Sequence, residues 1–270
     1  MTETAVTGRR VGDLLRDWRV RRRLSQMALA LEAGVSARHV SFVETGRARP
    51  SAEMILQLAE RLDVPLRERN RLLLAGGFAP VYGQADLDEA QLGEGNPVRT
   101  ALDRLLAAHD PAPALAVDRH WGLVAANRGV GFLLAGLTGE LVAPPVNVLR
   151  LSLHPDGLAP RIVNLAQWRG HVLHRLGRQA QQTGDPALAA LHAELLALPG
   201  GEDASAHEEH ADLFVPLRLR ADGGELTFLS TVTTFGTATD VTLAELAVET
   251  FLPADAATAA ALRAALPPAP

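Results

Sequence analysis

The sequence LSQMALALEAGVSARHVSFVETGRARPSAEMILQLAERLDV, residues 24–64, decides the fold of the first third of this chain. Ser25, Ser36 and Ser51 each precede a run of helical periodicity, where a hydroxyl can accept a hydrogen bond from an unpaired amide of the first turn. Gly34 separates the first two runs, because glycine readily takes the positive φ that ends a helix. The stretch predicts helices over residues 26–33, 36–45 and 51–62, and the same signals predict two more over 11–22 and 65–75.

The charge of the chain is divided unevenly along its 270 residues. Residues 1–80 carry 14 arginines and 9 acidic side chains, a formal charge of +5, whereas the remainder carries 12 arginines and 22 acidic side chains, a formal charge of −10. A basic N-terminal third favours binding to a polyanion. Two short helices joined by a glycine turn within such a unit are typical of a helix-turn-helix, so we expect an all-α DNA-binding domain over residues 8–77.

The second helix of such a pair presents its N-terminal turns to the base edges, and the first lies across the phosphate backbone. Arg38 is expected at a guanine, the commonest specific pairing of arginine, with a phosphate as the alternative. Glu44 is expected to have a structural role, and the arginines at 21–23 are expected to contact phosphates. The complete set of expected DNA-binding residues is Gln26, Ser36, Ala37, Arg38, His39, Ser41, Arg47 and Arg49.

This part of the chain resembles the XRE family of transcription regulators, the phage-repressor type of helix-turn-helix. The resemblance covers residues 11 to about 75 and rests on Ser25-Gln26, Ala30, Gly34-Val35-Ser36, Ser41, Glu44-Thr45-Gly46, Arg49-Pro50 and Leu58-Ala59. It implies a homodimer that binds a two-fold related operator in double-stranded DNA, with Gln26 and residues 36–41 at the DNA.

The C-terminal two-thirds has a different pattern, which begins after an expected linker over residues 78–96. Apolar runs on either side of residues 118–122 and 221–224 predict two hairpins, and residues 241–251, which also fit a helix, favour a third strand. We expect helices over 97–109, 127–135, 161–182, 186–198 and 256–265, and an exposed acidic loop over 200–211. Strands and helices without a parallel βαβ rhythm predict an α+β domain on an antiparallel sheet over residues 97–266.

The helix expected over residues 161–182 carries the candidate ligand site. A polar stripe that includes an indole lies at i, i+3, i+7, i+10 and i+14: Arg161, Asn164, Trp168, His171 and Arg175. An acid is recognised by an arginine and hydrogen-bond donors beside an apolar wall, which this stripe can supply. The residues equally fit a solvent-facing side on which Trp168 packs against the core.

This half of the chain resembles the ligand-binding domain of MmyB-like regulators, which accompanies an XRE head in that family. The resembling segments are residues 117–127, 147–169, 215–220 and 229–255. The resemblance implies a PAS-like fold with an apolar cavity and a fatty acid as the bound effector. It predicts a sequence-specific transcription regulator that senses a small apolar acid; the alternative is a C-terminal domain that serves only dimerisation and holds no ligand.

Several other classes of protein are not expected. The chain has no cysteine, which excludes thiol nucleophiles, disulfides and iron–sulfur clusters. The run His207-Glu208-Glu209-His210 lacks the spacing of a zinc-binding HExxH helix, and no nucleotide-binding glycine motif is present. We therefore expect no catalytic residue, no metal and no cofactor. The N-terminus has no apolar signal segment, and the longest uncharged run is 14 residues, so we expect a cytoplasmic protein that does not enter a membrane.

Overall fold

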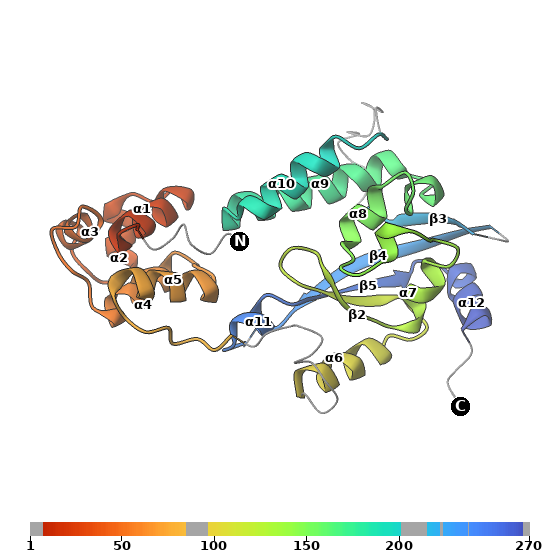
Figure 1. The fold of residues 1–270 in the computed structure, drawn as a ribbon, viewed down its shortest axis with the longest axis horizontal. Coiled ribbons are helices and arrows are strands. Elements are labelled where there is room, and N and C mark those ends of the chain that lie inside the picture. The colour runs from red at the N-terminus through yellow and green to blue at the C-terminus, as the bar shows by residue number, and fades with distance from the viewer. Residues whose placement is uncertain (1–7, 85–96, 201–214, 222–223, 237, 267–270) are drawn as a thin grey trace. The chain divides into compact units, whose positions relative to one another are not determined.

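The chain divides into two compact units in the computed structural model, which describes residues 8–84, 97–200, 215–221, 224–236 and 238–266 (Figure 1). The first unit is Met1–Ala85 together with Thr237–Ala244, and the second is Asp86–Gly236 with Glu245–Pro270. A short segment from the C-terminal half therefore belongs to the N-terminal unit.

Residues 8–84 form the five predicted helices: α1 (Val11–Arg21), α2 (Gln26–Glu32), α3 (Ala37–Glu44), α4 (Ala52–Arg61) and α5 (Leu66–Gly76). The three serine caps are present, since Ser25, Ser36 and Ser51 accept hydrogen bonds from the amides of Ala28, His39 and Met54. Gly34 in the turn between α2 and α3 has a φ of 65°, the left-handed conformation that favours glycine. Local signals alone therefore account for these helix boundaries.

Close packing of α1 on α3 shapes the centre of this unit. Leu15 and Trp18 of α1 are buried in one cluster with Leu29 of α2 and Val40 of α3. Gly12 allows the approach, because a Cβ at this position would lie 2.1 Å from the carbonyl oxygen of Val43. The helix pair is thus held by a contact that leaves no room for a side chain.

The start of the expected linker packs on α5 as part of the N-terminal unit. The Asn70 carboxamide accepts from the amides of Val81 and Tyr82, both at 3.1 Å, and donates to the Tyr82 carbonyl at 2.8 Å. The segment from the C-terminal half joins it there, since Val241 donates to the Gly83 carbonyl at 2.7 Å and helix α11 (Val241–Ala244) contacts α5. Residues 85–96 of the expected linker lie outside the described residues.

The described residues of the second unit contain a five-stranded antiparallel sheet in the order β2-β1-β5-β4-β3. Its strands are β1 (Ala114–Val117), β2 (Leu123–Ala126), β3 (Leu217–Ala221), β4 (Gly224–Thr234) and β5 (Ala247–Pro253). Both predicted hairpins are present, as β1–β2 and β3–β4. The fold class is confirmed: a helical helix-turn-helix region precedes an α+β region on an antiparallel sheet, whose strands curl in Figure 1.

Two predicted boundaries are wrong. The strand expected over 241–251 begins only at Ala247, because residues 241–244 form α11. The helix expected over 161–182 begins at Leu165, because the Val163 amide donates to the Arg218 carbonyl of β3 at 2.8 Å and Ile162 bridges Leu219. Pairing with a strand fixes these residues in a non-helical conformation. The expected loop over 200–211 lies almost wholly outside the described residues.

Helices pack around this sheet: α6 (Pro97–Ala107), α7 (Arg128–Leu133), α8 (Val148–Leu153), α9 (Leu165–Thr183), α10 (Pro186–Leu196) and α12 (Ala256–Ala265). Alternate strand residues, such as Val117 of β1, Phe228 of β4 and Phe251 of β5, share one buried cluster with Val172 and Leu176 of α9. Figure 1 shows α9 and α10 running side by side. Because of this alternation, Glu249 of β5 shares the face of Phe251 and is buried beneath α9.

Candidate functional site

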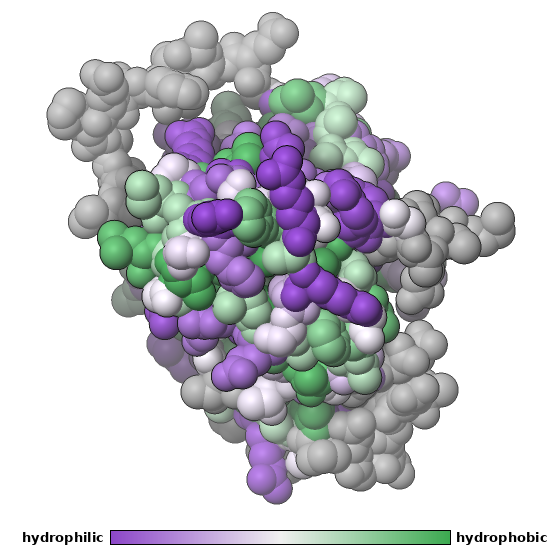
Figure 2. Space-filling view, turned by 90° about the vertical axis from the view of Figure 1, so that its left-hand side faces the viewer, coloured by the Kyte–Doolittle hydropathy of each residue, from purple (hydrophilic) through white to green (hydrophobic). Residues whose placement is uncertain are grey.

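The predicted DNA-binding residues lie on α2, α3 and the turn that follows α3. The Arg38 side chain is exposed, with its guanidinium 5.1 Å from the centre of the Phe42 ring. His39 and Ser41 are half-buried on the same helix, Ala37 is its first residue, and Arg47 and Arg49 are exposed after it. Figure 2 looks onto the helix-turn-helix unit from the left of the view in Figure 1, and hydrophilic residues cover much of the face that it shows.

Glu44 is the centre of a buried network that joins the first three helices. Its carboxylate accepts two hydrogen bonds from Arg19, at 2.6 and 2.9 Å, and one from the Gln26 carboxamide at 2.8 Å. Only 5% of Glu44 is exposed, and the hydrogen bond to it raises the pKa of Arg19. The structural role predicted for Glu44 is confirmed. Because a carboxamide has two N–H donors, the bond to Glu44 uses one of the two on Gln26.

Two arginines of the run at residues 21–23 make contacts within the N-terminal unit. Arg22 donates from Nε to the Leu62 carbonyl and from Nη2 to the Asp63 carbonyl, both at 2.8 Å, and so holds the end of α4. These two bonds use two of the five guanidinium N–H donors of Arg22, and the expected phosphate contact stays a prediction. Arg21 lies over the Trp18 ring, with its guanidinium 4.8 Å from the ring centre.

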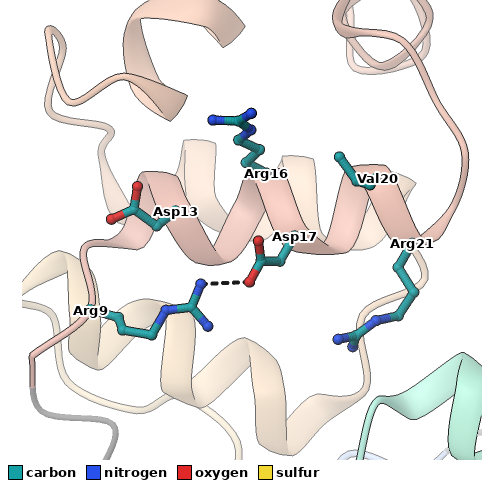
Figure 3. A pocket seen from close by; sticks show the side chains of 6 residues that line it. All are labelled: Arg9, Asp13, Arg16, Asp17, Val20 and Arg21. Atoms are coloured by element: carbon teal, nitrogen blue, oxygen red, sulfur yellow. Dashed lines mark hydrogen bonds and ion pairs between the residues drawn. The ribbon is translucent and has the colours of Figure 1, made fainter.

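A hollow on the surface of α1 is lined by Arg9, Asp13, Arg16, Asp17, Val20 and Arg21 (Figure 3). Arg9 and Asp17 form an ion pair at 2.5 Å, and about half of each side chain is exposed. Three arginines and two aspartates in contact with water leave a formal charge of only +1 and supply no apolar wall for a ligand. This hollow does not have the features of an enclosed binding site.

The structure separates the first two residues of the predicted ligand stripe from the other three. Arg161 ends a 3-10 turn (Ala159–Arg161) and donates to the Leu133 carbonyl at 2.7 Å. Asn164 precedes α9 and bridges to β3, donating to the Pro216 carbonyl at 2.8 Å and accepting from the Arg218 amide at 3.1 Å. Both side chains hold the start of α9 in place.

Trp168, His171 and Arg175 share one side of α9, facing the sheet. The Trp168 side chain is 3% exposed, and its Nε1 donates to Ser152 at 2.9 Å. Its ring stacks on His171 at a centroid distance of 5.7 Å and lies 6.4 Å from Phe251. Burial lowers the pKa of His171, and the positive charge of Arg175 lowers it further. His171 is therefore mostly neutral at pH 7.

Arg175 is the charged group of this cluster. Its Nη1 donates to the Glu249 carboxylate at 3.0 Å, and the guanidinium lies 4.4 Å from the centre of the Trp121 ring. The same Glu249 oxygen accepts from the Ser230 hydroxyl at 2.7 Å. The Nε and Nη2 atoms of Arg175 are buried and have no acceptor among the described residues. Two buried donors thus remain open beside aromatic side chains.

Sequence reasoning missed three members of this cluster: Trp121, Ser230 and Glu249. They come from the β1–β2 turn, from β4 and from β5, so no spacing in the sequence connects them to α9. One signal for Glu249 is visible in the sequence, because it is a single acid within the apolar strand of residues 247–253. A charge in a buried strand needs a partner, which marks such a residue for attention.

The described residues contain neither a cluster of metal-binding side chains nor a helix that could span a membrane. No three histidine, aspartate or glutamate side chains gather there in a way that could hold a metal ion. His207 and His210 lie outside this part. Within the same residues, no helix combines the length and apolarity needed to span a bilayer.

The helical unit and the α+β unit with its partly buried arginine together define a class of protein: a helix-turn-helix regulator with a second domain suited to a small ligand. Family models agree with this division, since a helix-turn-helix model matches residues 15–69 and the model of the MmyB-like transcription regulator ligand binding domain matches residues 98–265. The chain belongs to the MmyB-like transcription regulators, and both resemblances seen in the sequence are confirmed. No curated protein sequence matches the chain significantly.

Proposed function

We propose that this DNA-binding transcription regulator binds a two-fold related operator as a homodimer and that its C-terminal unit binds a small apolar acid, such as a fatty acid, as effector. The sheet order β2-β1-β5-β4-β3 supports the PAS-like architecture that the family resemblance implies. The exposed side chains of Arg38, Arg47 and Arg49 support a DNA contact through α3 and the turn after it.

The observation that carries the ligand proposal is the open edge of Arg175. A buried N–H without an acceptor costs about 1–3 kcal/mol, so an arginine with two such donors needs a further acceptor. A carboxyl group fits, because its two oxygens match the two parallel N–H groups of an arginine. Trp168 and Phe251 lie in the same cluster and supply apolar surface for the chain of such an acid.

The coupling that we propose follows the chain from this cluster to the DNA-binding unit. Ser230 and Glu249 lie on β4 and β5, and the connection between these strands enters the N-terminal unit at residues 237–244. A ligand that shifts either strand would therefore act on α11, which packs on α5. A coupling free energy of about 1–3 kcal/mol would change DNA affinity about 5–150-fold.

Native mass spectrometry of the purified chain, before and after denaturing extraction, tests the proposal. A dimer that carries a releasable apolar acid supports both parts, and the extracted mass identifies the chain length. A dimer without a ligand that also fails to bind added decanoic acid would favour a C-terminal domain that serves only dimerisation. A monomer in the presence of operator DNA would refute the homodimer.

Arg175→Lys tests the site itself, because lysine keeps the positive charge and loses the planar pair of N–H donors. We expect decanoic acid to bind this variant at least about tenfold more weakly, the loss of one charge-assisted hydrogen bond. Arg178→Lys is the matched control, since Arg178 lies on the same helix with an exposed side chain. Equal affinities of the two variants would show that the acid binds elsewhere.

A further inference from the structure

The way Arg175 is paired differs from the two-bond arginine–carboxylate contacts among the described residues. Where an aspartate or glutamate takes two hydrogen bonds from Nε and Nη2, it occupies that edge of the guanidinium fully. The pairs of this kind in the described residues include Arg10–Asp13, Arg19–Glu44, Arg150–Glu194 and Arg218–Glu225. At Arg175 the carboxylate of Glu249 binds Nη1 instead, and the buried Nε and Nη2 stay open. Glu249 therefore orients the guanidinium of Arg175 and leaves the edge formed by Nε and Nη2 open.

The charge of Arg175 is already balanced before any ligand arrives. Glu249 is 3% exposed and contacts the guanidinium directly, so the pair is neutral as a unit. His171, one turn earlier on α9, is neutral at pH 7 for the reasons given above, and His174 is exposed. On the adjoining turn and strand, Arg119 lies 3.8 Å from Glu245 and 3.6 Å from Asp185, which also binds His120 at 2.9 Å. No uncompensated cation faces the open edge from the described residues around it.

A carboxylate that bound this edge would place a second negative charge on a guanidinium that Glu249 already neutralises. Two carboxylates that share one buried site do not both stay ionised, and one of them retains a proton. A free carboxylic acid is ionised above about pH 5, so the proton must come from the solvent when the acid binds.

We propose that an acid bound at Arg175 enters together with one proton, shared between its carboxyl group and Glu249, so that Glu249 makes the site select head groups without net charge. This inference rests on the proposed function. It identifies Glu249 as a positioning and selectivity residue: it holds Arg175 through Nη1 and sets the charge of the ligand that the open edge accepts. A primary amide of the same chain length meets the same donors and needs no proton.

Isothermal titration calorimetry on the full chain tests the inference without any substitution. Decanoic acid is titrated in phosphate and in Tris at pH 7.5, and the difference in heat between the two buffers gives the number of protons taken up. We expect about one proton per acid and an affinity that falls about tenfold per pH unit from pH 6.5 to 8. Decanamide is expected to bind with no proton uptake and with the same affinity across this range.

Glu249→Gln is the matching variant, because it keeps the shape of the side chain and removes its charge. We expect this variant to bind decanoic acid without proton uptake and to prefer it to decanamide by at least about tenfold, since Arg175 is then an uncompensated cation. His171→Asn is measured beside it and is expected to retain the uptake. The inference is overturned if proton uptake disappears in His171→Asn and persists in Glu249→Gln, because His171 would then hold the proton.

The results separate this inference from the proposed function. Acid binding by the wild-type chain with no proton uptake would overturn the role of Glu249 and leave the acid as effector. Absence of binding by both decanoic acid and decanamide would refute the proposed function, and this inference with it. If Glu249→Gln does not fold, the proton count and the pH dependence of the wild-type chain decide the question alone.

Discussion

Glu44→Gln is the substitution that tests most directly how the helix-turn-helix is held together. The Glu44 side chain is 3% exposed and the Arg19 side chain 11%, so water cannot solvate the Arg19 guanidinium once its negative partner is removed. Breaking a buried ion pair by removing one partner costs about 3–5 kcal/mol. Glutamine retains an acceptor for Arg19, which also donates to the Leu24 carbonyl at 2.7 Å. We therefore expect a loss near the lower limit, about 3 kcal/mol, from the N-terminal unit alone.

The three tryptophans allow this loss to be assigned to one unit, because Trp18 lies in the N-terminal unit and Trp121 and Trp168 lie in the other. In a chain labelled with 5-fluorotryptophan, fluorine NMR across a urea titration follows each unit separately. The free energy of unfolding of a unit of this size falls by about 1 kcal/mol per M urea, so the midpoint of the Trp18 signal should fall by about 3 M. The midpoints of the other two signals should stay in place.

Glu68→Gln is the control for this experiment, because Glu68 pairs with Arg71 on the surface of α5 with both side chains partly exposed. An ion pair of this kind contributes at most about 1 kcal/mol. If Glu44→Gln moves the Trp18 midpoint no further than Glu68→Gln does, the network around Glu44 does not hold the helices together, and the reasoning is refuted.

Three further predictions concern DNA, packing and pH. Arg38→Ala should weaken operator binding by about 1–3 kcal/mol and relax the preference at one base pair; an unchanged preference in a competition assay would assign Arg38 to the phosphates. Gly129→Ala should destabilise the C-terminal unit by about 1–3 kcal/mol in thermal unfolding, because a Cβ there would lie 2.7 Å from the Pro111 carbonyl oxygen. Gly131→Ala is the control in the same helix, since a Cβ there meets open space and should not destabilise the unit. Since burial and Arg175 lower the pKa of His171, the unfolded chain binds a proton first as the pH falls, so the C-terminal unit should lose stability below about pH 6.5. Urea unfolding at several pH values should show this dependence reduced in His171→Asn and kept in His174→Asn.

The helix-turn-helix could be predicted almost completely because its signals are local. Each serine cap acts on an amide three residues later, and Gly34 acts on its own φ angle, so neighbouring residues carry the information. The hairpins of the second unit were predictable for the same reason, since a turn and its flanking apolar runs lie within a few residues of one another.

The candidate ligand site was predictable only in part. The helical repeat correctly placed Trp168, His171 and Arg175 on one side of α9, but it extended the same stripe to Arg161 and Asn164. Those two residues lie before the helix, because the chain at residues 162–163 pairs with β3. A periodic pattern cannot show where a helix begins when a distant strand competes for its backbone hydrogen bonds.

The sequence by itself determined the two domains, the helix-turn-helix and the side of α9 that carries the candidate ligand residues, because these depend on short-range periodicity and capping. Only the tertiary structure decided that Arg175 is paired with Glu249 and that residues 237–244 belong to the N-terminal unit. Arg175 and Glu249 are 74 positions apart, and their contact arises from the packing of α9 on the sheet. The free energy of such a contact depends on burial, which is a property of the folded chain and of no single segment.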